Sequence, residues 1–185
     1  MSHTVYKGID MKLLAFAATN SSNSINKQLA SYAASLVAGA DIEIIDLNDF
    51  ELPIYSDVQE QKLGQPDKAK RFFDKIGNAD AVIVSFAEHN GSYTAAYKNL
   101  FDWTSRIDQK VFQNKPMVML ATSPGPGGAQ NVLAAATSSA PYFAGDVKSS
   151  LSVPSFFDNF DSEQQALKDE KLVQELQAAV DALSS

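Results

Sequence analysis

Three polar or glycine-rich stretches carry the residues of this chain that could do chemistry, and all three suit ligand binding by backbone groups. The first stretch, Thr19-Asn20-Ser21-Ser22-Asn23-Ser24, follows an apolar run and precedes a helical pattern. The N–H groups and the dipole at the start of a helix favour an anion, so a phosphate group fits this position. The same hydroxyl and amide residues are also typical of an ordinary capped turn. The stretch lacks the Gly-Lys-Ser/Thr of a P-loop and the G-x-G-x-x-G of a dinucleotide fingerprint.

The second and third stretches offer main-chain groups and little side-chain bulk. Glu88-His89-Asn90-Gly91-Ser92 follows the apolar run Ala81–Phe86, and its peptide groups suit the edge of a flat ring. Gly91 permits a positive φ or a close approach of the ligand. His89 could stack near that ring or donate a proton beside it, or it is a plain surface residue. Ser123–Gly128 (SPGPGG) would let a ring lie against its backbone, or it is a flexible turn. Together the three stretches predict a site for a flat heteroaromatic cofactor.

The elements that must position these stretches alternate between strand and helix. Apolar runs predict strands over 12–18, 42–47, 81–86, 116–122 and 147–153. Apolar residues at helical spacing predict helices over 25–36, 67–77, 94–107, 129–140 and 162–183. This alternation gives an α/β fold with a doubly wound, five-stranded parallel sheet in a three-layer αβα arrangement, in the flavodoxin-like order 2-1-3-4-5. All three stretches then emerge at one edge of the sheet, where ligands bind at the switch point between strands one and three.

Two details concern side chains around this edge. Trp103 lies on the helical stripe formed by Ala96, Leu100, Trp103 and Ile107, so we expect it in the core rather than against a ligand. Residues 48–66 form a long connection without clear periodicity. Pro53 and Tyr55 are its candidates for ligand contact, and a plain surface excursion is the alternative.

Composition limits the class of protein. The 185 residues are 45% hydrophobic and 20% charged, which is typical of a globular protein, and we assign residues 11–185 to a single domain preceded by the extension Met1–Asp10. The net charge of −7 and the lack of a dense basic stretch argue against nucleic acid. The absence of cysteine excludes thiol chemistry, so redox activity would need a bound cofactor. With no apolar run near a membrane span and no secretory signal, we expect no membrane partner and a cytoplasmic location.

The motifs resemble those of the NAD(P)H-dependent FMN reductase family of flavodoxin-like proteins, which includes quinone, azo-dye and chromate reductases. The family's pattern P-E-Y-N-G-S, then L-K-N-x-x-D-W, corresponds here to residues 87–92 (AEHNGS) and 97–103 (YKNLFDW). Ser24 and Asn26 match the family pattern G-S-x-R-x-x-S-x-N, whereas Ser21 stands in place of its arginine. Residues 123–128 fit the pattern S-x-G-x-x-G-G, with Gln130 where arginine is common.

The resemblance implies an FMN cofactor, with its phosphate in the first stretch and its isoalloxazine ring against the other two. The implied cofactor-binding residues are Thr19, Ser21, Ser22, Ser24, Ile25, Asn26, Ala87, Glu88, His89, Asn90, Gly91, Ser123, Pro124, Gly125, Gly127 and Gly128. A homodimer or homotetramer is also implied, with the Glu88 carboxylate free to face the partner subunit. Because Ser21 replaces an arginine, FMN should bind more loosely unless another cation, such as Lys27, reaches the phosphate.

The activity implied by the resemblance is transfer of hydride from NAD(P)H, through N5 of the flavin, to a small-molecule acceptor such as a quinone, an azo compound or free flavin. We expect no catalytic side-chain nucleophile or obligatory base, because the cofactor carries the chemistry. No metal is expected. A non-enzymatic, flavodoxin-type electron carrier is the alternative, for which the acidic charge would suit a basic partner. A third possibility is a scaffold that has lost flavin binding.

Overall fold

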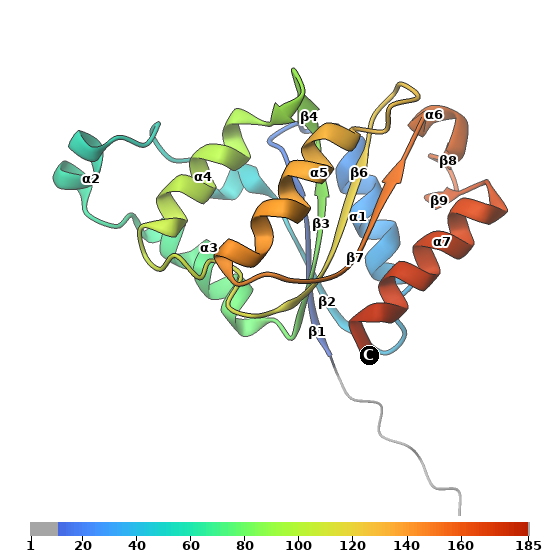
Figure 1. Cartoon of the computed structure of the whole chain (residues 1–185), viewed down its shortest axis with the longest axis horizontal. Helices are drawn as coiled ribbons and strands as arrows, with labels where there is room; N and C mark the ends of the chain where they lie inside the picture. The colour runs from blue at the N-terminus through green and yellow to red at the C-terminus, as the bar shows by residue number, and fades with distance from the viewer. Residues whose placement is uncertain (1–10, 185) are drawn as a thin grey trace, which may run out of the picture.

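The structure is a computed structural model that describes residues 11–184, so the predicted extension Met1–Asp10 lies outside the described residues. A five-stranded parallel sheet forms its centre (Figure 1). The strands are β1 (Lys12–Ala18), β2 (Asp41–Ile45), β3 (Ala81–Phe86), β6 (Pro116–Thr122) and β7 (Asp146–Val153). Their order, β2-β1-β3-β6-β7, is the predicted order 2-1-3-4-5. The predicted flavodoxin-like fold is therefore confirmed.

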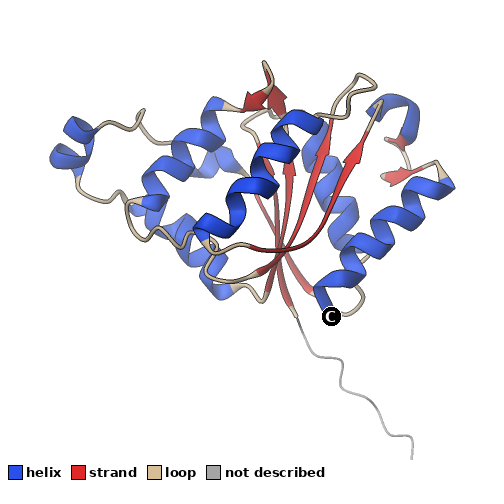
Figure 2. Cartoon of the chain, viewed as in Figure 1, coloured by secondary structure: helices blue, strands red, loops and turns tan. Residues whose placement is uncertain are grey.

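Helices cover both faces of the sheet (Figure 2). α1 (Ile25–Ser35) and α7 (Glu170–Asp181) pack on one face, and α3 (Asp67–Asn78), α4 (Ala95–Ser105) and α5 (Gln130–Ser139) pack on the other. Successive side chains of a strand point to opposite faces, so β1 places Leu13 and Ala15 in one apolar cluster and Leu14 and Phe16 in the other. Burial on both faces explains why the central strands are nearly unbroken apolar runs in the sequence.

The connection after β2 is partly helical, contrary to the prediction. It contains a 3-10 turn at Leu47–Phe50 and the helix α2 (Asp57–Leu63). Ser56 caps α2, because its side chain accepts a hydrogen bond from the N–H of Gln59 at 3.1 Å. None of the residues of α2 is buried, so no apolar stripe marks the helix in the sequence. In Figure 1, α2 stands away from the sheet.

The C-terminal segment also differs from the prediction of one helix over 162–183. The chain first forms the short helix α6 (Phe156–Asn159) and a hairpin of β8 (Phe160–Asp161) and β9 (Ala166–Leu167), and α7 begins only at Glu170. The Asp161 carboxylate accepts hydrogen bonds from the N–H groups of Glu163 and Gln164, which lower the pKa of Asp161 below its usual value. Such side-chain bonds to nearby backbone compete with helix formation.

The buried stripe of α4 is shifted relative to the prediction. Its buried residues are Tyr97, Leu100, Trp103 and Thr104. Ala96 and Ile107 are only half-buried. Trp103 is 1% exposed, and its Nε1 donates a hydrogen bond to the carbonyl of Pro53 at 2.7 Å, so the prediction that it belongs to the core is confirmed. Within residues 11–184, no helix has both the length and the apolar character needed to cross a membrane.

Candidate cofactor site

The three predicted stretches meet at the carboxyl ends of β1, β3 and β6. These strands are neighbours in the sheet, and their registers place Ala18 beside Phe86 and Phe86 beside Ala121. The segments that follow them lie together along the upper edge in Figure 1. Most of their residues are exposed, as Ser22, Asn90 and Gly127 illustrate. The edge is therefore open to a ligand.

The first stretch presents unpaired backbone donors at the start of α1. Ser24 caps the helix, and its Oγ accepts a hydrogen bond from the N–H of Lys27 at 3.1 Å. The N–H of Ser21 donates to Oγ1 of Thr19 at 3.2 Å. Within residues 11–184, the N–H groups around the start of α1 that lack a hydrogen-bond acceptor include those of Ser22, Asn23, Ile25 and Asn26. Unpaired N–H groups at the positive end of a helix dipole form an anion site.

The Asn26 side chain joins the ends of two strands to α1. Its Oδ1 accepts hydrogen bonds from Oγ of Ser85 at 2.8 Å and from the N–H of Thr122 at 3.1 Å. Its Nδ2 donates to the carbonyl of Thr122 at 3.2 Å, and Asn26 is only 2% exposed. We therefore assign Asn26 a positioning role, with its main-chain N–H free for a ligand.

Sequence reasoning missed Thr94 and Thr122, which complete this network. Oγ1 of Thr94 donates to the carbonyl of Ala18 at 2.9 Å and accepts from the N–H of Tyr97 at 3.2 Å, so the cap of α4 is tied to the end of β1. Oγ1 of Thr122 donates to the carbonyl of Val153 at 2.7 Å, tying β6 to β7. A hydroxyl residue at the end of an apolar strand, as in residues 116–122 (PMVMLAT), is the signal that could have identified Thr122.

The second stretch forms a hairpin rather than a simple turn. β4 (Glu88–His89) pairs with β5 (Ser92–Tyr93), and the turn between them has a φ of +52° at Asn90 and +77° at Gly91. An Asn-Gly pair suits a two-residue hairpin because both residues tolerate a positive φ. The peptide groups of this turn are held at the sheet edge, and His89 is exposed beside them.

The Glu88 carboxylate is not free to face a partner, so that expectation is wrong. One carboxylate oxygen accepts a hydrogen bond from the N–H of Val132 at 2.8 Å, and the other lies 3.4 Å from Nδ2 of Asn131. Both donors belong to the first turn of α5, where a negative charge also interacts favourably with the helix dipole. The Glu88 side chain therefore links the hairpin to the first turn of α5 by hydrogen bonds.

Replacing Glu88 by alanine should lower the free energy of unfolding by about 1 kcal/mol, because the first turn of α5 loses a capping carboxylate. Urea denaturation followed by circular dichroism measures this change. Glu88→Gln is the matched control, because its side-chain oxygen still accepts from the N–H of Val132. An equal free energy of unfolding for Glu88→Ala and the wild type would show that these hydrogen bonds do not stabilise the contact between the hairpin and α5.

The third stretch is held by hydrogen bonds to residues 152–156, so it is not a freely flexible turn. The carbonyls of Ser123 and Gly125 accept from the N–H groups of Phe156 and Ser155 at 3.0 and 2.9 Å. At Gly128, where φ is +58°, a Cβ atom would lie 2.3 Å from Oγ of Ser152, so only glycine fits. A Cβ atom at Gly125 or Gly127 would meet no atom of the described part of the chain within 4 Å. The loop therefore has space for a ligand beside the backbone of these two glycines.

The cation nearest to the first stretch along the chain, Lys27, is already paired. Nζ of Lys27 lies 2.6 Å from Oδ2 of Asp46, and this contact lowers the pKa of the Asp46 carboxyl below its usual value. Lys27 and Asp46 line a small hollow together with Thr19, Ser21 and Ser24. The Asp46 carboxylate thus offsets the charge that Lys27 could offer to a phosphate.

The connection after β2 forms a wall beside the first stretch. Nδ2 of Asn99 donates to the carbonyl of Pro53 at 3.1 Å, and the N–H of Tyr55 donates to Oδ1 of Asn99 at 2.8 Å. A cavity of about 260 Å³ lies between this connection, Asn20 and the start of α4. Contact of Pro53 and Tyr55 with a ligand stays a prediction.

A parallel sheet in this order, with backbone-lined loops at its carboxyl edge, defines a flavodoxin-like protein. The sequence profile described as NADPH-dependent FMN reductase matches residues 11–158, and the chain belongs to this family.

Individual relatives agree with this assignment. The chain is 33% identical over 117 residues to an NAD(P)H-dependent FMN reductase of Pseudomonas aeruginosa, covering 63% of this chain and 62% of the relative. It is 35% identical over 105 residues to a 2-hydroxy-1,4-benzoquinone reductase of a Burkholderia species, covering 56% and 55%. The chain thus spans less than two thirds of the length of these curated relatives. The solved structure of a flavoenzyme NAD(P)H:acceptor oxidoreductase from Paracoccus denitrificans matches with a TM-score of 0.74 and 26% identity, over 94% of both chains.

Proposed function

We propose that this protein is an FMN-dependent NAD(P)H oxidoreductase that reduces a small-molecule acceptor such as a quinone, an azo compound or free flavin. Family membership and the names of the relatives in Pseudomonas, Burkholderia and Paracoccus support the proposal. The structural observation that carries it is the group of unpaired N–H donors at the start of α1, beside two loops whose backbone is exposed. When bound, FMN supplies the redox chemistry by accepting hydride from NAD(P)H at N5 and passing two electrons to the acceptor.

The residues of this chain bind and orient the cofactor in this proposal. Main-chain N–H groups of residues 22–26 hold the phosphate, with the Ser24 cap and the Asn26 side chain keeping the start of α1 in place. Peptide groups of the hairpin turn at Asn90 and Gly91 bind the edge of the isoalloxazine ring. The open side of the loop at Gly125 and Gly127 allows the ring to approach the backbone. No side chain of the site is required to move a proton.

We also propose a cytoplasmic homodimer or homotetramer built from a single domain over residues 11–185. The open sheet edge supports this assembly, because a neighbouring copy would cover the exposed face of a flat ring. Light scattering after size-exclusion chromatography tests the assembly, and a monomer at all concentrations would contradict it.

The function is tested on the purified full-length protein incubated with excess FMN and then desalted. Retained flavin absorption bands and oxidation of NADH or NADPH that depends on a quinone are the expected results. Retained flavin without turnover of either nucleotide would favour an electron carrier. Absence of flavin bands would contradict the proposal as a whole.

Replacing Asp46 by asparagine should tighten FMN binding by about 3- to 10-fold, because Lys27 loses its carboxylate partner and becomes available to the phosphate. Quenching of FMN fluorescence during titration with apoprotein measures the dissociation constant. The gain should shrink at high salt, since the new interaction is between charges. Adding Lys27→Met to Asp46→Asn should abolish the gain, and a gain that survives this second change would show that Lys27 is not responsible.

A further inference from the structure

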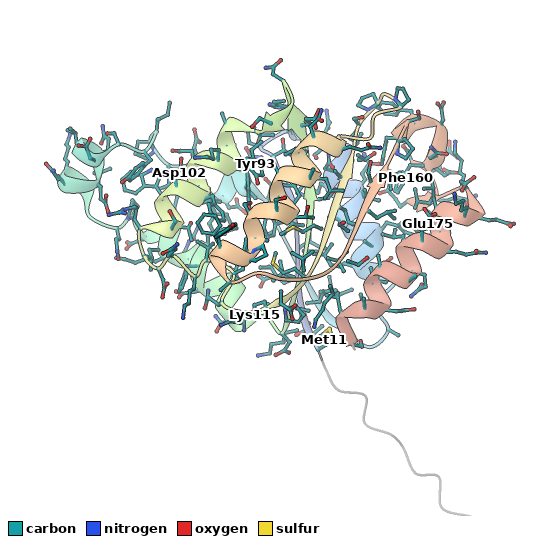
Figure 3. The ribbon with its side chains drawn as sticks, in the orientation of Figure 1. Met11, Tyr93, Asp102, Lys115, Phe160 and Glu175 are labelled. Atoms are coloured by element: carbon teal, nitrogen blue, oxygen red, sulfur yellow. The ribbon has the colours of Figure 1, made fainter. Side chains whose placement is uncertain are left out.

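A second cavity lies between α4 and α5, apart from the candidate cofactor site. Its volume is about 330 Å³, and six of its 13 lining residues are aromatic: Phe86, Tyr93, Tyr97, Phe101, Phe112 and Phe143. None of residues 19–26, 87–91 or 123–128 lines it. In Figure 3, Tyr93 lies between the two helices and Asp102 lies on α4. We call this space the α4–α5 cavity.

A hydroxyl group of the cavity wall lacks a hydrogen-bond partner. Tyr97 is 4% exposed, and its hydroxyl makes no hydrogen bond to any group within residues 11–184. The hydroxyl oxygen is not fully buried, so it reaches the space of the cavity and can meet a ligand there. By contrast, the hydroxyl of Tyr93 lies 3.3 Å from Oγ of Ser139. Burial raises the pKa of Tyr97, so its phenol stays neutral and can donate.

The charges around the α4–α5 cavity cancel within the protein. The charged residues that line it are Lys98 and Asp102, and Nζ of Lys98 lies 2.7 and 2.8 Å from the two carboxylate oxygens of Asp102. Among the described residues that line the cavity, no unpaired charge is therefore available to a charged ligand, which would lose its hydration without compensation. The wall instead favours aromatic rings, which pack edge-to-face against other rings.

We propose that the α4–α5 cavity binds an uncharged aromatic molecule that carries a hydrogen-bond acceptor, recognised by the hydroxyl of Tyr97. An apolar cavity of roughly 150 Å³ is large enough for benzene, so a space about twice as large fits a molecule of about two fused rings. The inference does not depend on the proposed function, because the cavity shares no residue with the three loops.

Isothermal titration of the full-length protein with 2-naphthol tests the proposal, with and without saturating FMN. We expect one molecule bound per chain in both cases. Tyr97→Phe keeps the ring and removes the hydroxyl, so binding should weaken by about 3- to 10-fold without a lower melting temperature. Ala135→Leu places bulk at the exposed rim of the cavity and should weaken binding by about 10-fold or more.

Two controls separate this site from others. Tyr142→Phe, at a tyrosine that is 77% exposed and outside the cavity wall, should leave the affinity for 2-naphthol unchanged. The charged analogue 2-naphthalenesulfonate should bind at least about 10-fold more weakly.

Three results would overturn the proposal: no binding of 2-naphthol, binding that FMN displaces, or binding that neither Tyr97→Phe nor Ala135→Leu weakens. Displacement by FMN would place the molecule at the cofactor edge. No binding to an oligomer, together with a monomeric Ala135→Leu variant, would show that a second copy of the chain covers the cavity. Each of these results leaves the flavin spectrum and nucleotide turnover, and so the proposed function, to be judged separately.

Discussion

Valine in place of Gly125 should weaken FMN binding by about 10- to 100-fold while leaving the fold intact. A Cβ atom at Gly125 meets no atom of residues 11–184 within 4 Å, so this part of the protein has room for the side chain. In the proposed complex that room belongs to the isoalloxazine ring, and the added methyl groups would push the ring away from the loop. Gly127→Val should act in the same way, because the space at Gly127 is equally open.

Fluorescence titration of FMN with each apoprotein measures the affinity, and thermal unfolding of the same samples monitors the fold. Ser162→Val is the matched control, because Ser162 is exposed in the turn between β8 and β9, far along the chain from the three loops. Its affinity for FMN should equal that of the wild type. Unchanged affinity in both glycine variants, with unchanged melting temperatures, would place the flavin ring elsewhere.

Loss of the Asn26 side chain should lower the free energy of unfolding of the cofactor-free protein by about 2–4 kcal/mol. Asn26→Ala leaves the hydroxyl of Ser85 and the main-chain groups of Thr122 buried without partners. Each unsatisfied buried group costs about 1–3 kcal/mol, which is more than the net value of the hydrogen bond itself. The start of α1 would also lose its anchor to β3 and β6, so FMN binding should weaken with stability.

Urea denaturation measures the loss, and Asn23→Ala provides the control. Asn23 lies in the same stretch but is exposed, so its replacement should change stability by less than about 0.5 kcal/mol. The double variant Asn26→Ala with Ser85→Ala should lose less free energy of unfolding than the two single variants lose in sum. Each single change leaves the other partner buried without its hydrogen bond, and the double change removes both partners. Strict additivity would mean that the hydrogen bond between Asn26 and Ser85 contributes little.

Local patterns in the sequence were sufficient to predict the order of the sheet and the burial of Trp103, whereas the hairpin of β4 and β5 was not predicted. Apolar runs such as 12–18 and 81–86 identify central strands because both faces of each strand are covered, and the handedness of crossovers leaves few possible orders. The Asn90-Gly91 turn follows from the backbone conformations that these two residue types tolerate. The position of each strand, the Asn90-Gly91 turn and the buried stripe of α4 depend on residues close to one another along the chain.

Only the tertiary structure decided which polar side chains are available to a ligand. Asn26 bonds to Thr122, 96 residues away, and Glu88 bonds to Val132, 44 residues away, so neither carries the side-chain freedom that its position in a polar stretch suggested. Lys27 is likewise neutralised by Asp46, 19 residues away. α2 escaped detection because it buries no residue. The spacing of apolar residues indicates which side of a segment faces the core. Hydrogen-bond and ion-pair partners depend instead on which distant segments the fold brings together.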